Sequence, residues 1–261
     1  MRGRRLVLLA VISAAVILAL PLSRGMGETR SALPPGHWTL KFADEFNGSG
    51  LDRAKWRPNW LGGSDVQVTK PVNGLELSCY HPGQVTVSSG AARLWIAKEA
   101  CKANDGRTYP YRSALIQTYD HFRFTYGYME ARMWLPHGTG RPVDWPAFWA
   151  DGTGNWPKTG EIDVMEVLGG GKLCWHFHYS GGAPGDCPRL WNPAGWHTFG
   201  ADWEPGSITW YYDGVKVGRV THGVTKSPMY LIANLAISNR EGGQMSHGTH
   251  TTLDYVRVWQ H

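Results

Sequence analysis

Charged residues and long helical patterns are both scarce in this chain. Asp, Glu, Lys and Arg make up 18% of the 261 residues, and no extended stretch repeats its apolar residues at helical spacing. Glycine (33) and tryptophan (14) are abundant instead. This composition is typical of short strands, tight turns and aromatic surfaces rather than of helices. The sequence also lacks internal repeats, which argues against a repeat architecture.

Excess positive charge is largely absent beyond the N-terminus. The formal net charge is +5, but Arg2, Arg4, Arg5 and Arg24 lie in the first 25 residues, which contain no acid. The rest of the chain carries 22 basic and 21 acidic residues. A nucleic-acid-binding surface is therefore not expected.

The N-terminus has the pattern of a secretory signal. A basic start is followed by the apolar run from Leu6 to Leu20, which ends at Pro21. Because the run is long and no Ala-x-Ala cleavage site follows, an uncleaved membrane anchor is the alternative for residues 1–25. Residues 26–36 are predicted to be a linker and residues 37–261 a single domain. We expect a secreted protein, or one anchored at the outer face of the membrane.

Cysteines are few, and in an exported chain they favour disulfides. Three pairings are possible, and we prefer Cys79 with Cys101 and Cys174 with Cys187. The second pair would close the glycine-rich segment 181–185 beside an acidic strand. The alternative is a metal site in which Cys174 and Cys187 are joined by His176 and His178.

Strand signals recur along most of the chain. The Asp213-Gly214 pair between two alternating runs is a strong hairpin signal. So many short strands predict an all-β fold, an antiparallel β-sandwich of jelly-roll type. Strands are expected at residues 84–87, 92–97, 173–179, 196–203, 229–235 and 253–259.

Three acids crowd into one β-prone run, Glu161-Ile162-Asp163-Val164-Met165-Glu166. In a regular strand Glu161 and Asp163 share a face and Glu166 points to the other. A β-bulge near Val164-Met165 would bring Glu166 onto the acidic face, and we predict that bulge. Paired carboxylates of this kind suit glycoside hydrolysis, and their mutual repulsion keeps at least one protonated near neutral pH.

Aromatic residues gather just before the acids. Trp145 and Trp149 share a face by parity, and Trp156 follows, whereas Phe148 has the opposite phase and is predicted to lie in the core. Pyranose rings stack on indoles, so we expect the three tryptophans to line an oligosaccharide cleft on a concave sheet face.

The chain resembles glycoside hydrolase family 16 from Trp38 to Gln260. The acidic run looks like the bulged catalytic signature of the laminarinase-like branch. Stretches that agree in order include residues 42–47, 124–132, 145–149, 196–199, 210–214 and 253–258.

The resemblance implies a jelly roll with a concave cleft and a retaining double displacement. Glu161 would be the nucleophile, Glu166 the acid and base, and Asp163 an assistant between them. Trp145, Trp149, Trp156, His178 and Asn234 are expected to contact sugar. Asp44-Glu45 falls in a stretch that the family uses structurally. No catalytic cofactor or metal is implied, although a structural calcium ion on the convex side is possible.

Two departures from the family pattern concern sugar binding. Leu115 stands where many laminarinase-like members carry Arg, and residues 238–248 lack a cleft tryptophan. We expect a monomer acting on a polysaccharide, as an endo-hydrolase of β-linked glucan with β-1,3 linkages. The alternatives are a transglycosylase, a hydrolase of mixed-linkage glucan or galactan, and a non-catalytic carbohydrate-binding jelly roll.

Overall fold

A computed structural model describes residues 33–138, 140–189 and 193–261 of the chain. The predicted signal or anchor (1–25) and most of the predicted linker lie outside the described residues. Residues 33–36 precede the first strand. Within the described ranges, no helix has the length and hydropathy needed to cross a membrane.

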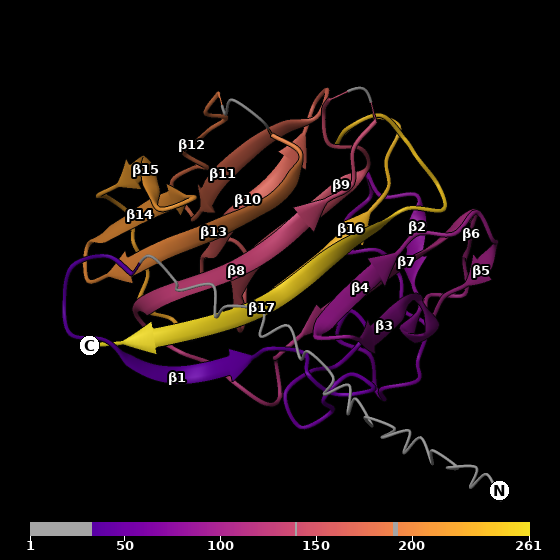
Figure 1. Cartoon of the computed structure of the whole chain (residues 1–261), viewed down its shortest axis with the longest axis horizontal. Coiled ribbons are helices and arrows are strands. Elements are labelled where there is room, and N and C mark those ends of the chain that lie inside the picture. Colours follow the sequence, from indigo (N-terminus) through magenta and orange to yellow (C-terminus); the bar gives the residue numbers. More distant parts are fainter. Residues whose placement is uncertain (1–32, 139, 190–192) are drawn as a thin grey trace, which may run out of the picture. The chain divides into compact units, whose positions relative to one another are not determined.

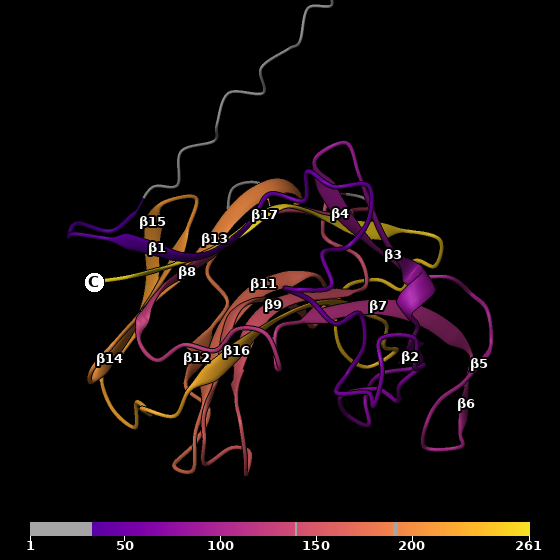
Figure 2. The same cartoon turned by 90° about the horizontal axis from the view of Figure 1, so that it is seen from below.

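The described residues fold as a sandwich of two large sheets, which confirms the predicted jelly-roll class. Figure 2 shows the sheets as two layers, with β17 in one and β9 and β16 in the other. The first sheet has the order β15-β14-β13-β8-β17-β4-β3, with β1 also paired to β17. Its strands are β1 (Thr39–Asp44), β3 (Val85–Ser88), β4 (Ala91–Trp95), β8 (Gly127–Leu135), β13 (Gly195–Glu204), β14 (Ser207–Tyr212), β15 (Val215–Val220) and β17 (His250–Gln260).

The second sheet carries the acidic run and has the order β12-β11-β10-β9-β16-β7-β2. All of its pairs are antiparallel except β2 with β7. Its strands are β2 (Ser78–Tyr80), β7 (Tyr111–Gln117), β9 (Trp145–Gly152), β10 (Glu161–Leu168), β11 (Lys172–His178), β12 (Gly185–Asp186) and β16 (Met229–Ala236). A short 3-10 turn η1 (Pro82–Gln84) and a ribbon of β5 (Cys101–Lys102) and β6 (Thr108–Tyr109) complete the elements.

The core lies between the two sheets. Inward-facing side chains of both sheets form one buried cluster, in which Phe148 of β9 and Phe199 of β13 are fully buried. The prediction that Phe148 belongs to the core is confirmed. Because side chains alternate along a strand, the residues on either side of Phe148 point away from this core and form the outer face of the second sheet.

The predicted hairpin is present between β14 and β15. Asp213 and Gly214 both have positive φ, 50° and 76°, as a two-residue turn of this hand requires. The Asp213 carboxylate also accepts a hydrogen bond from the backbone N–H of Thr198 at 2.8 Å. The turn is thereby tied to β13.

The last strand in chain order, β17, lies inside the first sheet. Figure 1 shows β17 in yellow with β1 along one edge and β8 along the other, and it also pairs with β4.

The two acids at and directly after the end of β1, Asp44 and Glu45, make structural contacts. Asp44 accepts hydrogen bonds from the Phe46 N–H and the Trp56 indole, and Glu45 pairs with Arg257. The structural role expected for Asp44-Glu45 is confirmed.

Candidate active site

A β-bulge interrupts the acidic strand β10 where the sequence predicts it. On β9, the consecutive residues Trp149 and Phe148 pair with Asp163 and Met165, so Val164 is the extra residue. The pairing with β11 shifts over the same segment. Val164 and Met165 are consecutive yet both fully buried in the core. Glu166 is consequently returned to the outer face, and Glu161, Asp163 and Glu166 line one hollow.

Side chains from the opposite sheet support the backbone at the bulge. The indole N–H of Trp210 donates to the carbonyl of Asp163 at 2.9 Å, and the Tyr212 hydroxyl donates to the carbonyl of Cys174 at 2.9 Å. Cys174 is the residue of β11 that faces Glu166. Both donors lie on β14 and are buried. Buried backbone carbonyls need a hydrogen-bond donor. These two side chains supply it from inside the sandwich and so stabilise the irregular part of the strand.

Asp163 occupies the centre of the acidic row, which consists of Glu161, Asp163 and Glu166. It shares a hydrogen bond with Glu161, and its Oδ2 lies 3.1 Å from Nε2 of His178, a contact at ion-pair distance without hydrogen-bond alignment. His178 is also the cross-strand partner of Glu161. On the other side of Glu161, the indole N–H of Trp156 donates to its carboxylate. His178 therefore contacts Asp163 of the acidic row, and its predicted contact with sugar stays a prediction.

Glu166 is held by two neighbouring strands. The Trp145 indole on β9 donates to Oε2 at 3.2 Å, and Nδ1 of His176 on β11 lies 2.9 Å from Oε1. The two carboxylate oxygens thus have one partner each. These contacts fix the direction of the Glu166 side chain along the row.

The acids do not titrate like free carboxylic acids. Burial, followed by the charge of Asp163, raises the pKa of Glu161 well above its ordinary value. Burial, followed by the charge of Glu166, does the same to the pKa of Asp163. A hydrogen bond between two carboxyl groups needs one proton, so the titrations of Glu161 and Asp163 are coupled.

Trp149 and Asn234 lie beside the hollow but are mostly buried. The Trp149 indole donates to Asn234 Oδ1 at 2.8 Å, and the Asn234 amide donates to the Tyr80 hydroxyl at 3.1 Å. Trp149 also packs in a cluster that contains Leu115, the residue that departs from the family pattern. Both residues line the hollow, the Trp149 indole and the Asn234 amide have the partners just described, and their contact with sugar stays a prediction. Trp156 differs, since its side chain is 58% exposed.

The far wall of the hollow contains an acid that the sequence analysis did not single out. Glu76 is 6% exposed. Its carboxyl group accepts a hydrogen bond from the Asn73 amide at 3.3 Å and forms a side-chain hydrogen bond with Tyr80. The Oε2 atom is buried and has no partner within hydrogen-bond geometry. Burial raises the pKa of Glu76 to about 7. The part of the lining formed by Asn73 and Glu76 is therefore polar.

A loop from the end of β16 positions Trp145. Asp144, directly before Trp145, accepts hydrogen bonds from the Ser246 N–H at 2.6 Å and the Thr249 hydroxyl at 2.7 Å. Gly242 has φ of 85°, and a Cβ there would lie 2.7 Å from the Asp144 carbonyl oxygen and 3.0 Å from Cβ of Trp145. Only glycine fits this close approach. The loop is thus packed directly against the tryptophan that contacts Glu166.

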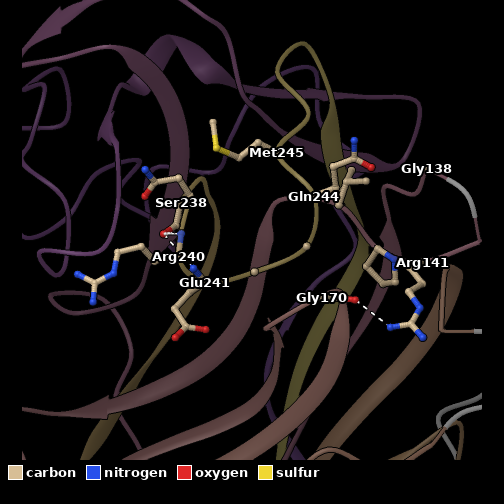
Figure 3. Close-up of a pocket in the computed structure, with 13 residues that line it drawn as sticks. Gly138, Arg141, Gly170, Ser238, Arg240, Glu241, Gln244 and Met245 are labelled. Atoms are coloured by element: carbon tan, nitrogen blue, oxygen red, sulfur yellow. Dashed lines mark hydrogen bonds between the residues drawn. The ribbon is translucent and has the colours of Figure 1, made fainter.

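This loop also lines a second hollow, drawn in Figure 3. Arg240 and Arg141 lie on opposite sides of the hollow, and Arg141 donates to the Gly170 carbonyl at 3.1 Å. The Glu241 side chain extends from the same loop. Residues 238–248, which lack the tryptophan often found in the family, therefore present polar and charged side chains.

Both predicted disulfides are present, Cys79–Cys101 and Cys174–Cys187. The second joins β11 to the segment after β12. The alternative metal site is wrong, because its two sulfurs are bonded to each other. One of its histidines, His176, instead contacts Glu166 and the other contacts Asp163.

Sequence reasoning missed three further residues around the row: His176 as a partner of Glu166, Glu76 in the wall, and Asp151 across from Glu161. The alternation of His176 with His178 was a usable signal, since residues two apart share a strand face. The other two depend on strand register and on a distant loop.

Comparison with known proteins agrees with this geometry. Residues 75–257 match glycosyl hydrolases family 16. The endo-1,3-1,4-beta-glycanase EglC of Rhizobium meliloti is 30% identical over 247 residues, covering 85% of this chain and 51% of EglC, so the chain spans about half of that relative. The beta-glucanase of Rhodothermus marinus is 29% identical over 268 residues, covering 90% of this chain and 89% of the relative.

A solved structure shows the same architecture. The endo-beta-1,3-glucanase of Pyrococcus furiosus superposes with a TM-score of 0.70 at 27% identity, covering 85% of this chain and 94% of that protein. The matched segment includes the bulged strand with its three acids and the strands on either side of it. The chain belongs to glycosyl hydrolases family 16.

Proposed function

We propose that the protein is a retaining endo-glycoside hydrolase that cleaves β-linked glucan, with β-1,3 linkages as the first choice. The observation that carries the proposal is the bulge, which places Glu161, Asp163 and Glu166 on one outer face beside exposed and half-buried indoles. Two carboxyl groups that flank the scissile bond of a bound sugar, with a third carboxyl group between them, suit double displacement at the anomeric carbon.

Glu161 is the nucleophile in this mechanism. Its carboxylate attacks the anomeric carbon and forms a glycosyl ester, while the bond to the leaving sugar oxygen breaks. Attack requires ionised Glu161, so the proton shared within the pair must reside on Asp163 at that moment. The Trp156 indole, which donates to Glu161, orients the attacking oxygen.

Glu166 supplies the proton to the leaving oxygen and later removes a proton from the attacking water. Trp145 and His176 hold its two oxygens in place for both steps. The negative charge of Glu161 disappears when the ester forms. Glu166 can then act as a base, since the repulsion along the row has fallen.

The residues that line the hollow and the names of similar proteins both support this substrate class. Trp145 and Trp156 offer indole faces for pyranose rings, and Asn73 and Glu76 offer hydrogen bonds for hydroxyl groups. EglC, the Rhodothermus enzyme and the Pyrococcus enzyme are named for β-glycans, two of them with 1,3 linkages in the name. We assign Trp149 and Asn234 to the floor of the cleft and His178 to the support of Asp163.

The remaining parts of the proposal concern context. Residues 1–25 would direct export or anchor the enzyme outside the membrane, which agrees with the two disulfides. The structural calcium ion expected on the convex side stays a prediction. Acid–base chemistry by the three carboxyl groups requires no cofactor. The enzyme is proposed to act as a monomer.

Removal of the nucleophile tests the function. Glu161→Gln should lower the release of reducing ends from laminarin by at least about 10⁴-fold, because an amide cannot form the ester. Glu166→Ala should also be inactive, and azide should restore turnover of an activated aryl glycoside. Mixed-linkage glucan, galactan, agar and carrageenan are assayed in parallel, and product masses separate hydrolysis from transglycosylation. Undiminished activity of the first variant would end the assignment.

A further inference from the structure

A fourth carboxyl group lies beside the proposed nucleophile. Asp151 of β9 is the direct cross-strand partner of Glu161, and Tyr230 of β16 is in turn the partner of Asp151. Asp151 also shares a strand face with Trp145 and Trp149 by parity. The three residues Glu161, Asp151 and Tyr230 therefore form a line across three neighbouring strands on the outer face of the sheet.

Tyr230 holds the Asp151 carboxyl group, and a backbone contact with Gly152 also lowers the pKa of Asp151. Its Oδ2 accepts a hydrogen bond from the Tyr230 hydroxyl at 3.1 Å, whereas its Oδ1 is buried and has no hydrogen-bond partner. No cation is paired with it among the described residues. The tyrosine therefore holds the carboxyl group from the β16 side of β9.

This placement costs stability and needs a reason. Like charges directly opposite each other on one face of a sheet are destabilising. A buried carboxyl oxygen without a partner adds a desolvation penalty. An apolar residue at position 151 would avoid both costs. The mechanism described above does not use Asp151, so its carboxyl group is unexplained by the three-acid row.

We propose that Asp151 is a positioning residue for Glu161: held by Tyr230, its negative charge opposes ionisation of the nucleophile and sets the acidic limit of activity. The proposal rests on the assignment of Glu161 as nucleophile. It adds a device by which this chain restricts turnover on the acidic side of the optimum, above the pKa of Asp151, without altering the three acids.

The electrostatic surroundings of Glu161 agree with this role. Burial is the largest influence on its pKa, and the charges of Asp163 and Asp151 raise the pKa further, while His178 and the Trp156 indole lower it. Glu166 acts on the row through Asp163. Burial also raises the pKa of Asp151 itself to about 6, so its negative charge acts on Glu161 above about that pH.

The test is the pH profile of kcat/KM on laminarin for Asp151→Asn. Asparagine retains an acceptor for the Tyr230 hydroxyl and removes the charge. Glu161 then ionises more readily, so the acidic limb should move to lower pH by about half a unit to one unit, a typical effect of one nearby charge. Activity at the optimum should change by less than about threefold. A second variant, Asp151→Ser, should shift the limb in the same direction.

A matched control comes from the other sheet. Burial raises the pKa of Asp202 on β13 to about 6 as well, and its Oδ1 is also buried without a partner. Asp202→Asn should leave the acidic limb in place, although it loses a comparable buried charge. An unshifted limb in both Asp151 variants, or an equal shift in Asp202→Asn, would overturn the proposal.

Failure of this inference is distinguishable from failure of the proposed function. If Glu161→Gln is inactive and the Asp151 variants keep the wild-type profile, only the role of Asp151 is wrong. If Glu161→Gln remains active, the nucleophile is misassigned, and the inference falls with it.

Discussion

At the scale of single residues, the carboxyl groups differ through their partners rather than their chemistry. Glu166 contacts the imidazole of His176 and accepts a hydrogen bond from one indole, while Asp163 lies between Glu161 and His178. Asp44, equally acidic in sequence, is occupied by a backbone N–H and an indole. The same residue type therefore serves structure in one place and, in the proposed mechanism, chemistry in another.

The contact of His176 with Glu166 leads to a prediction about leaving groups. His176→Ala removes the partner of Oε1, so the acid loses its orientation and kcat on laminarin should fall about 10- to 100-fold. On an aryl glycoside with a good leaving group, which needs no protonation, the loss should shrink to a few fold. Parallel assays on both substrates check this.

The control for this prediction is His250→Ala. His250 packs against Trp95 and Trp134 in the first sheet, away from the row, and its removal should affect both substrates little. An equal loss of His176→Ala on laminarin and on the aryl glycoside would show that the histidine does not act through the acid.

Sequence reasoning found the residues whose evidence is local. The three acids and the bulge follow from a hexapeptide, and Phe148 follows from parity. Asp151 and Glu76 were not found, because their meaning comes from register between β9 and β10 and from a segment about 85 residues before the acids. A cross-strand partner cannot be named before the pairing of the strands is known.

At the scale of elements, the bulge is held by the opposite sheet. Trp210 reaches across the core to the Asp163 carbonyl, so the shape of the catalytic strand depends on β14. The hairpin β14–β15 was predicted from its turn residues, but this bond was not. Local turn chemistry specifies a hairpin, whereas the contacts of its buried indole require the complete sandwich.

Replacement of Trp210 distinguishes an effect on the stability of the protein from an effect on the geometry of the acidic strand. Trp210→Phe leaves the Asp163 carbonyl without its donor, which should lower the free energy of unfolding by about 1–3 kcal/mol. It should also lower kcat, since the row rests on that backbone. Denaturant unfolding and laminarin kinetics on the same preparation measure both effects.

Trp56→Phe is the matched variant. Trp56 is fully buried and its indole donates to Asp44 at 2.8 Å, far along the chain from the acids. This variant should lose stability while its kcat stays within about twofold of the wild type. A drop in kcat of the same size in both variants would contradict a specific role of Trp210.

At the scale of the whole described domain, several buried acids link folding to pH. Burial raises the pKa of Glu76 to about 7 and those of Asp144, Asp151 and Asp202 to about 6. The folded state therefore binds more protons than the unfolded state between the ordinary pKa and these values. Stability is fully present below pH 4 to 5 for these groups and is lost as pH rises through 6 to 7.

The thermal midpoint should accordingly be higher at pH 5 than at pH 8. Glu76 alone, being almost fully buried, contributes a difference of roughly 3 kcal/mol. Glu76→Gln should reduce the gap between the two midpoints, whereas Glu99→Gln, at an exposed ion pair, should not. Differential scanning calorimetry at both pH values decides this, and a midpoint that rises with pH would contradict it.

The position of β17 has a consequence for biosynthesis. A nascent chain emerging from the ribosome presents β1, β4 and β8 long before the strand that joins them. The edges of β1, β4 and β8 that pair with β17 stay unpaired until β17 has been synthesised. Pairings between strands far apart in the sequence also form slowly. A truncation within β17 should therefore disrupt the interior of the first sheet and not only its edge, because β1, β4 and β8 all pair with β17.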